Sequence, residues 1–477
     1  MFSGPNYGHF VSKDFINWAP LPTAIWNGLD SSTTPFTVTN YDRGGIWSGS
    51  AQVFEGAGPG GKGKGIVTVY PGLCDKMHWP ACGTGYVLAQ AVPADYRGDQ
   101  LLTNWTKPGY NPIVENATRD PTSAWKTPSG SWRLTTFSSH VFEAESDAAV
   151  LKGQWKDLGH NPDFRSGSNV EAECPSFYPL PAATPGTEAA YHAAQQQEGG
   201  LPTHVRKTSC DGDWWQLGTY DAKKMGEMGS FVATPGWEDL WPVKELDRGN
   251  FYASKDNAFP TLQGGSRRIN WGWATLGDAS SQNLPREITF NAAARTLQQY
   301  PIKELQALRG KPVSTSAPGP VKLPPGTANH SEIVATFTLP ETAATLGVMV
   351  SGADNATTCS VDYVPGAKHV NVSCSSSAPC FGRGHLLPDG TTSFFKDTVS
   401  ILSSETTFEI RVFSDATFLE VFFQKGRAAM TIPAAMSATT ELSVLAPVKV
   451  GVNATAWPMR GIWVTPDAVR AAPRVYT

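Results

Sequence analysis

The sequence has little of what several common functions require. Only 17% of its 477 residues are charged, and the formal net charge is −4. Because no basic excess is available to neutralise phosphates, the composition excludes nucleic acids and anionic membrane surfaces as expected partners. No apolar run reaches about 18 residues, the length that a transmembrane helix needs. No membrane-spanning segment is therefore predicted.

Signatures of metal and serine chemistry are missing as well. There is no Cys-x-x-Cys pair, and the nine histidines show neither His-x-x-His nor His-x-x-x-His spacing. No metal site and no cofactor are therefore predicted. The Gly-x-Ser-x-Gly elbow of serine hydrolases is absent too, so that chemistry has no support.

What the chain does have is turn formers and aromatic rings. It contains 46 glycines and 37 prolines, and 11% of its residues are aromatic. This composition favours many short strands joined by turns, and it supplies flat rings that can stack on sugars. The length is too great for one ordinary core and suits two domains.

Cysteines and glycosylation sequons favour a secreted or vacuolar/cell-wall protein. Of the seven cysteines, Cys74 and Cys82 lie close together, and we expect them to form one disulfide. A second is expected within the trio Cys359, Cys374 and Cys380, although spacing alone leaves its pairing open. Six Asn-x-Ser/Thr sequons stand at Asn104, Asn116, Asn329, Asn355, Asn371 and Asn453. Residues 1–25 show no signal peptide.

The chain reads as mostly strand. Short β-branched or aromatic runs bounded by turn residues, such as Gly65–Tyr70 and Trp214–Tyr220, dominate it. Helical periodicity is scarce, and Tyr300–Arg309 is the best candidate for a short helix or a turn of helix. Similar material recurs about every 50–65 residues, which suits propeller blades of about four strands.

A second domain is predicted after a Pro-, Ser- and Gly-rich stretch at Lys311–Pro325. The strand runs beyond it fit a β-sandwich; examples are Glu332–Thr338, Thr407–Phe413 and Thr417–Phe423. We therefore expect a propeller domain at residues 1–310, a linker at 311–328 and a sandwich at 329–477.

Three polar segments lie among aromatic residues: Ile46-Trp-Ser-Gly-Ser-Ala51, Thr118-Arg-Asp-Pro121 and Glu171-Ala-Glu-Cys-Pro175. Two of them supply carboxyl groups, and hydrolysis of a glycosidic bond with retention needs two, about 5–5.5 Å apart. The setting of Glu173 suits a general acid. Asp120 follows Arg119, whose positive charge favours an ionised carboxylate that can bind sugar hydroxyls. Alone, each motif is usually a turn or a structural element.

Their order and spacing together resemble glycoside hydrolase family 32, the family of invertases, fructan hydrolases and fructosyltransferases. Five further segments are similar to family motifs and extend the resemblance over almost the whole chain. They are Tyr7–Trp18, Asp247–Lys255, Arg267–Trp273, Leu284–Glu287 and Ser414–Phe423 with Gly426-Arg427.

The resemblance implies an all-β fold, with a five-bladed β-propeller whose first blade is incomplete, followed by a C-terminal β-sandwich. It implies that Glu173 is the general acid/base and that Asp120 holds the fructose hydroxyls. Arg119 would orient the site, and Trp47 and Ser48 would line the fructose pocket.

The same resemblance implies a substrate role for Asp247. In plant-type members this aspartate helps to recognise the glucose part of sucrose. Its usual basic companion is replaced here by Asn250, which weakens that expectation.

One family motif has no counterpart in the sequence. The family's nucleophile is the Asp of a Trp-x-Asn-Asp-Pro-Asn-Gly segment about 30 residues before the position of Tyr7, and the 477 residues contain no such segment. One interpretation is a chain whose N-terminal part is missing. The other is a non-catalytic relative that keeps Glu173 and Asp120 for sugar binding.

The predicted function is hydrolysis of β-fructofuranosides such as sucrose or fructan, by retaining double displacement in a complete enzyme. The alternatives are a fructosyltransferase, a fructan exohydrolase and a non-catalytic sugar-binding protein. An arabinanase-like protein is disfavoured because Ser414–Arg427 matches the family's sandwich. The expected partner is a small sugar; nothing in the sequence indicates an oligomeric state.

Overall fold

In the structure, a computed structural model, strands are by far the main regular secondary structure. The α-helices within the described part of the chain are short: α1 (Asp147–Leu151), α2 (Glu188–Gln195) and α3 (Pro466–Ala471). None of the helices that the structure describes is long and apolar enough to cross a membrane. It describes residues 5–56, 58, 63–80, 82–95, 98–164, 173–197, 200–209, 212–224, 228–234, 244–276, 279–352, 356–376, 385–386, 392–393, 395–434 and 440–474.

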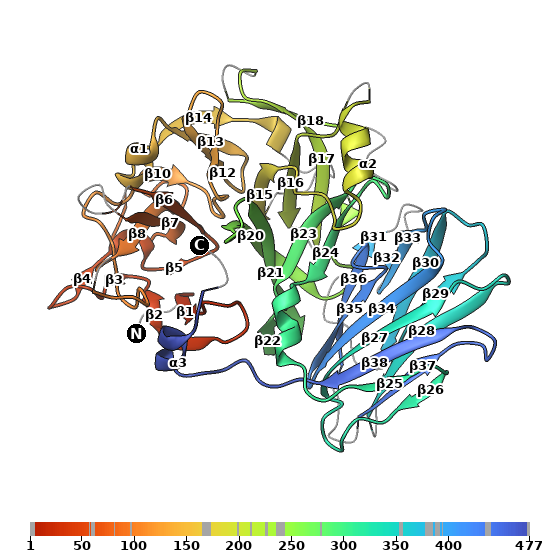
Figure 1. The fold of residues 1–477 in the computed structure, drawn as a ribbon. Coiled ribbons are helices and arrows are strands. Elements are labelled where there is room, and N and C mark those ends of the chain that lie inside the picture. Colours follow the sequence, from red (N-terminus) through yellow and green to blue (C-terminus); the bar gives the residue numbers. More distant parts are fainter. Residues whose placement is uncertain are drawn as a thin grey trace.

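Five sheets follow one another along the first part of the chain and lie around a common centre (Figure 1). The first sheet pairs β1 (Tyr7–Val11) with β2 (Ala19–Ile25). The second contains β5 (Gly45–Ile46), β6 (Ser50–Glu55), β7 (Lys64–Leu73), β8 (Tyr86–Pro93), β9 (Trp105–Thr106) and β10 (Val114–Ala117). Between these two sheets in chain order comes a small hairpin of β3 (Leu29–Asp30) and β4 (Thr37–Val38).

Three further sheets complete the propeller. The third contains β11 (Trp125–Lys126), β12 (Trp132–Thr135), β13 (His140–Ala144) and β14 (Lys156–His160). The fourth contains β15 (Glu173–Pro179), β16 (His204–Ser209), β17 (Asp213–Asp221), β18 (Ser230–Ala233) and β19 (Lys244–Glu245). The fifth contains β20 (Phe251–Pro260), β21 (Ser266–Leu276), β22 (Ala279–Gln282), β23 (Arg286–Asn291) and β24 (Thr296–Pro301).

The second part of the chain forms two six-stranded sheets. One contains β25 (Val313–Thr315), β38 (Val452–Pro458), β27 (His330–Thr338), β34 (Thr407–Asp415), β35 (Phe418–Phe423) and β36 (Ala428–Pro433). The other contains β26 (Gly319–Val321), β37 (Glu441–Leu445), β28 (Ala344–Ser351), β29 (Ala356–Tyr363), β30 (His369–Ser376) and β33 (Lys396–Ser400). A further pair joins β31 (His385–Leu386) and β32 (Thr392–Ser393). The predicted propeller followed by a sandwich is confirmed.

Strand β35 explains why the sandwich packs against the propeller (Figure 1). Successive side chains of a strand point to opposite faces of the sheet. Leu419, Val421 and Phe423 belong to the core between the two sandwich sheets, whereas Phe422 packs in a separate cluster with residues of the propeller. Glu420, on the same face as Phe422, is also buried. Both faces of β35 are therefore covered, one by each part of the molecule.

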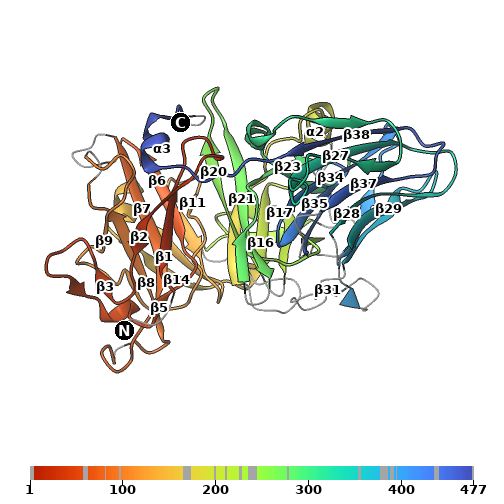
Figure 2. The ribbon, with the colours of Figure 1, turned by 90° about the horizontal axis from the view of Figure 1, so that it is seen from below.

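After β38 the chain returns to the propeller, where α3 lies beside β1 and β2 (Figures 1 and 2). The backbone N–H of Trp18 donates to Ile462 O (2.8 Å), and Val464 N donates to Trp18 O (2.9 Å). Val469 of α3 is buried in a small cluster with Ala19 of β2. The C-terminal segment thus covers part of the two-stranded first sheet.

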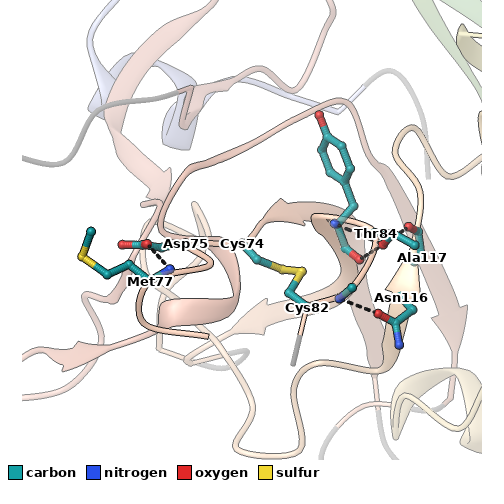
Figure 3. Close-up of a disulfide and its surroundings, with 9 residues drawn as sticks. Cys74, Asp75, Met77, Cys82, Thr84, Asn116 and Ala117 are labelled. Carbon is teal, nitrogen blue, oxygen red and sulfur yellow. Dashed lines mark hydrogen bonds between the residues drawn. A yellow bond between two sulfur atoms is a disulfide. The ribbon is translucent and has the colours of Figure 1, made fainter. Parts of the chain in front are cut away.

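Both expected disulfides are present. Cys74 bonds to Cys82, as Figure 3 shows, and Cys359 bonds to Cys374 between β29 and β30. Cys174 is a free, buried thiol. Cys210 and Cys380 lie outside the described residues.

The main departure from the predicted elements is near residue 300. The short helix or turn expected at Tyr300–Arg309 is a 3-10 helix at Lys303–Leu308, and the first two residues of the segment, Tyr300 and Pro301, belong to β24 instead. Leu305 and Leu308 are buried in the cluster that joins propeller and sandwich. Within the stretch predicted as a linker, β25 and β26 each add an edge strand to one sandwich sheet.

Candidate functional site

Four residues predicted for the site lie at the start of a strand of a propeller sheet or in the loop before one. Trp47 and Ser48 precede β6, and Asp120 lies in the turn before β11. Glu173 is the first residue of β15. Hydrogen bonds from Cys174 to Ser48 and from Arg119 to Glu173 join these strand ends. The propeller thus brings together side chains that lie up to 126 residues apart in the sequence.

A β-bulge sets the direction of Glu173. The register of β15 against β16 shifts between Glu173 and Ser176, and Cys174 has a left-handed φ of 42°. Bulges and left-handed non-glycine residues are frequent beside functional sites, where they re-aim a side chain. A second bulge lies in β20 between Tyr252 and Lys255, where Ala253 has a φ of 51°.

Both carboxylate oxygens of Glu173 accept hydrogen bonds from side chains. Arg119 Nη2 donates to Oε1 over 2.6 Å, and the Tyr252 hydroxyl donates to Oε2. The guanidinium of Arg119 also lies 3.8 Å from the centre of the Phe137 ring. The Glu173 side chain keeps 31% of its exposure, so a ligand can reach it. A carboxyl group that is both oriented and accessible suits proton transfer.

Asp120 is buried, with 4% exposure and a left-handed φ of 63°. Its Oδ2 accepts from the backbone N–H of Cys174 (3.1 Å) and lies 3.7 Å from Arg119 Nε. Burial raises the pKa of Asp120, although the charge of Lys255 opposes this. The sequence suggested that Arg119 would lower the pKa of Asp120; its charge acts in that direction, but burial outweighs it.

Trp47 and Ser48 form the part of the site contributed by the loop before β6. The Trp47 side chain is 43% exposed, and its carbonyl accepts from the Tyr7 hydroxyl (2.7 Å). The Cys174 thiol donates to Ser48 Oγ (3.4 Å), which links this loop to β15. Gly49 passes so close to β7 that a Cβ there would overlap the carbonyl oxygen of Val69.

Lys255 links the segment after Asp120 to strand β15. Its Nζ donates to the carbonyls of Pro121 and Pro175, each over 3.1 Å. Burial lowers the pKa of Lys255, and the neighbouring Cys174 and Asp120 raise it. Burial raises the pKa of the Cys174 thiol to about 11. The thiol therefore acts as a neutral hydrogen-bond donor at neutral pH.

Asp247 is not brought to this site. It is 1% exposed, and its oxygens accept from Gly249 N (2.8 Å), Thr431 N (2.8 Å), Thr431 Oγ1 (2.9 Å) and Arg286 Nη1 (2.8 Å). Asn250, at the position of the basic companion, donates its side-chain N–H to Thr275 O. The structure places Asp247 between propeller and sandwich, where Gly249, Arg286 and Thr431 donate to its oxygens.

Sequence reasoning did not single out Tyr252 and Trp273. They are cross-strand partners on β20 and β21, and their ring centres lie 6.2 Å apart. Trp273 is 47% exposed. Both stand inside segments that carry the family resemblance, so the signal was present without an assigned role. The described residues contain no cluster of three or more potential metal ligands.

Comparison with protein families gives two matches that together cover most of the chain. The model of the glycosyl hydrolases family 32 N-terminal domain matches residues 3–311. The model of the family 32 C-terminal domain matches residues 304–441.

Curated proteins with similar sequences are β-fructofuranosidases and fructan hydrolases. The chain is 32% identical over 331 residues to an insoluble β-fructofuranosidase isoenzyme 4 of Oryza sativa, covering 65% of this chain and 50% of the relative. It is 29% identical over 334 residues to a fructan 6-exohydrolase of Triticum aestivum, covering 65% and 51%. The chain thus spans about half the length of the curated relatives it matches.

Solved structures show the same fold. Fructan 1-exohydrolase IIa of Cichorium intybus superposes with a TM-score of 0.72 at 20% identity, over 98% of this chain and 91% of the other. The family 32 β-fructofuranosidase BmSUC1 of Bombyx mori superposes with a TM-score of 0.60 at 18% identity, over 96% and 85%.

Proposed function

Because the chain belongs to glycosyl hydrolase family 32, we propose that it binds the fructosyl end of β-fructofuranosides. Glu173 is the acid/base, and Asp120 holds the fructose hydroxyls. The observation that carries this proposal is the Asp120–Arg119–Glu173 arrangement. A buried carboxylate and an accessible one share one guanidinium, and the loop that contacts Cys174 through Ser48 carries the exposed Trp47.

Each element of the arrangement has a role in binding or proton transfer. The free lone pairs of Asp120 accept hydrogen bonds from sugar hydroxyls, and these bonds are strong because the carboxylate is charged and shielded from water. Glu173 protonates the leaving oxygen and later activates water, as in retaining glycosidases. Trp47 and Trp273 offer exposed rings to the apolar faces of the sugar. Several structures similar to this chain contain sugars, among them a fructan 1-exohydrolase variant in complex with 1-kestose.

Fructans are the better candidate substrate class than sucrose. In plant-type relatives the carboxylate at the position of Asp247 helps to recognise glucose, but here Asp247 is withdrawn behind Thr431. The leaving group of a fructan is a further fructosyl unit or chain, which has no need of that contact. We therefore propose that fructan oligosaccharides bind more tightly than sucrose.

Isothermal calorimetry tests the proposed site. The chain is expected to bind methyl β-D-fructofuranoside, sucrose and 1-kestose, with the highest affinity for 1-kestose. Asp120→Asn is expected to weaken binding of all three about 10- to 100-fold, because hydrogen bonds to a charged acceptor contribute about 1.5–3 kcal/mol. Asp157→Asn is the matched control, since Asp157 is exposed and, within the part of the chain that the structure describes, its ion pair is with His140.

Absence of binding to all three sugars would overturn the proposal, as would equal affinities in Asp120→Asn and the wild type. The same samples are assayed for release of fructose. The polypeptide used in the assay, these 477 residues, contains no Asn-Asp-Pro-Asn-Gly segment. Because loss of a nucleophile lowers rates by many orders of magnitude, it is expected to bind without measurable turnover.

We propose that the protein is secreted or delivered to the vacuole or cell wall. Two disulfides support this, because such bonds persist in oxidising compartments. Exposed sequon asparagines also support it, and one of them, Asn116, stands beside the Cys74–Cys82 bridge (Figure 3). Its Oδ1 accepts from Gly83 N (2.8 Å). A glycan attached to Nδ2 leaves that hydrogen bond intact.

Burial predicts which sequons carry glycans after secretion from a eukaryotic host. Asn329 is expected to stay unmodified. Its Oδ1 is buried, and Ser331, the serine of the same sequon, is only 1% exposed. Peptide mass mapping before and after enzymatic deglycosylation measures each site. A glycan on Asn329 would contradict the prediction; Asn355 lies outside the described residues. The exposed sites expected to be modified are Asn104, Asn116, Asn371 and Asn453.

A further inference from the structure

The chain segment just before β20 is hydrogen-bonded to the sandwich strand β36. Arg248 N donates to Ala429 O (2.9 Å), and Asn250 N donates to Thr431 O (2.8 Å). Between them, Gly249 lies so close to Thr431 that a Cβ would overlap its backbone. Residues 247–250 therefore lie against β36, and their position depends on the sandwich.

The side chain of Asp247 adds two further hydrogen bonds between this segment and β36. Its two oxygens accept from the Thr431 backbone N–H and from the Thr431 hydroxyl. Arg286 Nη1 neutralises the carboxylate at 2.8 Å, and Arg286 in turn pairs with Glu420 of β35 over 2.6 Å. All three ionised side chains are at most 2% exposed. In such a dry setting, hydrogen bonds to the carboxylate are strong and leave it one favourable position.

Tyr252, whose hydroxyl contacts the proposed acid/base Glu173, lies five residues after Asp247 in the chain. Asn250 Nδ2 donates to Thr275 O (2.8 Å), which fixes the entry of β20 against β21. Two residues later, Tyr252 pairs with Trp273 across the sheet and donates its hydroxyl to Glu173. Residues 247–250 connect β19 to β20 and are held by backbone hydrogen bonds to β36, so a displacement at Asp247 is expected to move the phenol at Glu173.

We propose that Asp247 is a positioning residue that uses the β-sandwich to hold the Tyr252 hydroxyl against Glu173. It contacts neither the sugar nor the reacting atoms. The sandwich thereby becomes part of the machinery that sets the protonation of Glu173, rather than only a support for the propeller. The inference rests on the proposed role of Glu173 as acid/base.

The expected consequence is electrostatic. A hydrogen bond to the ionised form of a carboxyl group favours that form. Weakening the Tyr252–Glu173 hydrogen bond is therefore expected to shift the titration of the Glu173 carboxyl to higher pH. Burial and the Glu173 hydrogen bond both raise the pKa of Tyr252, which keeps the phenol protonated as a donor. The titratable or charged groups around Glu173 and Tyr252 are Arg119, Asp120, Cys174 and Asp213.

The test measures Glu173 directly, without a sugar. Protein labelled with ¹³C at the glutamate carboxyls is titrated by NMR, and Glu173→Gln identifies the signal. Tyr252→Phe is expected to raise the midpoint of the Glu173 titration by about 0.5 pH units or more. Asp247→Asn and Thr431→Val are expected to shift it in the same direction, although neither residue touches Glu173.

Arg309→Met is the matched control for destabilisation. Arg309 pairs with the buried Glu332 of the sandwich but not with residues 247–252. It is expected to lower the melting temperature and leave the midpoint unchanged. If Asp247→Asn and Thr431→Val lower the melting temperature but keep the wild-type midpoint, the inference fails. Failure of the proposed function would instead appear as absence of fructoside binding in the calorimetric experiment.

Discussion

Arg286→Met is expected to destabilise the protein by about 3–5 kcal/mol, a large part of the 5–15 kcal/mol that usually separates folded from unfolded chains. Arg286 is fully buried and pairs with Asp247 and Glu420, which are themselves buried. Its guanidinium lies 4.5 Å from the centre of the Phe251 ring. Methionine fills much of the volume but leaves two buried carboxylates without a counter-charge.

The dependence on pH separates lost charge from lost packing. Burial raises the pKa of Glu420 even in the wild type, and Arg286 opposes that rise. A carboxyl whose pKa is raised on folding stabilises the fold at low pH and loses that contribution as the pH rises. The deficit of Arg286→Met is therefore expected to be largest at neutral pH and to shrink towards pH 4–5.

Thermal and denaturant unfolding at pH 7 and pH 4.5 measure this difference. Lys126→Met is the control, because its pair with Asp147 is exposed and surface pairs contribute about 0–1 kcal/mol. If Arg286→Met yields no folded protein, Arg286→Lys keeps the charge with fewer donors and is expected to show a smaller deficit of the same sign. A variant within about 0.5 kcal/mol of the wild type at pH 7 would contradict the prediction.

Asp120→Asn, which is expected to weaken sugar binding, is expected to stabilise the free protein at neutral pH by about 1 kcal/mol. Burial raises the pKa of Asp120 and so makes its ionised form unfavourable in the fold. The wild type therefore loses stability as the pH rises through that pKa, whereas the asparagine variant does not titrate. The advantage of the variant should be present at pH 7 and fade as the pH approaches 4.

Differential scanning calorimetry of both proteins between pH 4 and pH 7 gives the difference in free energy of unfolding. Asp157→Asn again serves as control, because its exposed carboxylate should leave the difference near zero at every pH. An Asp120→Asn variant that is less stable than the wild type at pH 7 would contradict the prediction. In that case Lys255 and Arg119 would offset the cost of burial in full.

Arg286→Met and Asp120→Asn both change the charge balance of buried carboxylates, and they are expected to change the stability of the fold in opposite directions. Asp247 and Glu420 are balanced by Arg286, so removing the cation is costly. Asp120 is only partly balanced, because Arg119 makes its shorter contact with Glu173, at 2.6 Å rather than 3.7 Å. A site held ready for a ligand carries this unfavourable term until the ligand binds.

Much of this protein was determined by local pattern in the sequence. Alternating apolar residues and turn formers predicted the strands at Trp214–Tyr220 and Glu332–Thr338, because these elements depend on neighbouring residues and on burial of one face. The ordered motifs identified the family, and with it Glu173 and Asp120, because each motif is a short contiguous segment. The disulfide between Cys74 and Cys82 followed from their short separation.

Only the tertiary structure decided what the carboxylates face. Arg119 is adjacent to Asp120 in sequence, yet it reaches to Glu173, and burial governs the pKa of Asp120. Asp247 lies in a matching motif but faces Thr431, 184 residues further along the chain, and the nearby Tyr252 contacts Glu173 instead. Burial and long-range contacts depend on how whole sheets pack, and no local spacing of residues encodes them.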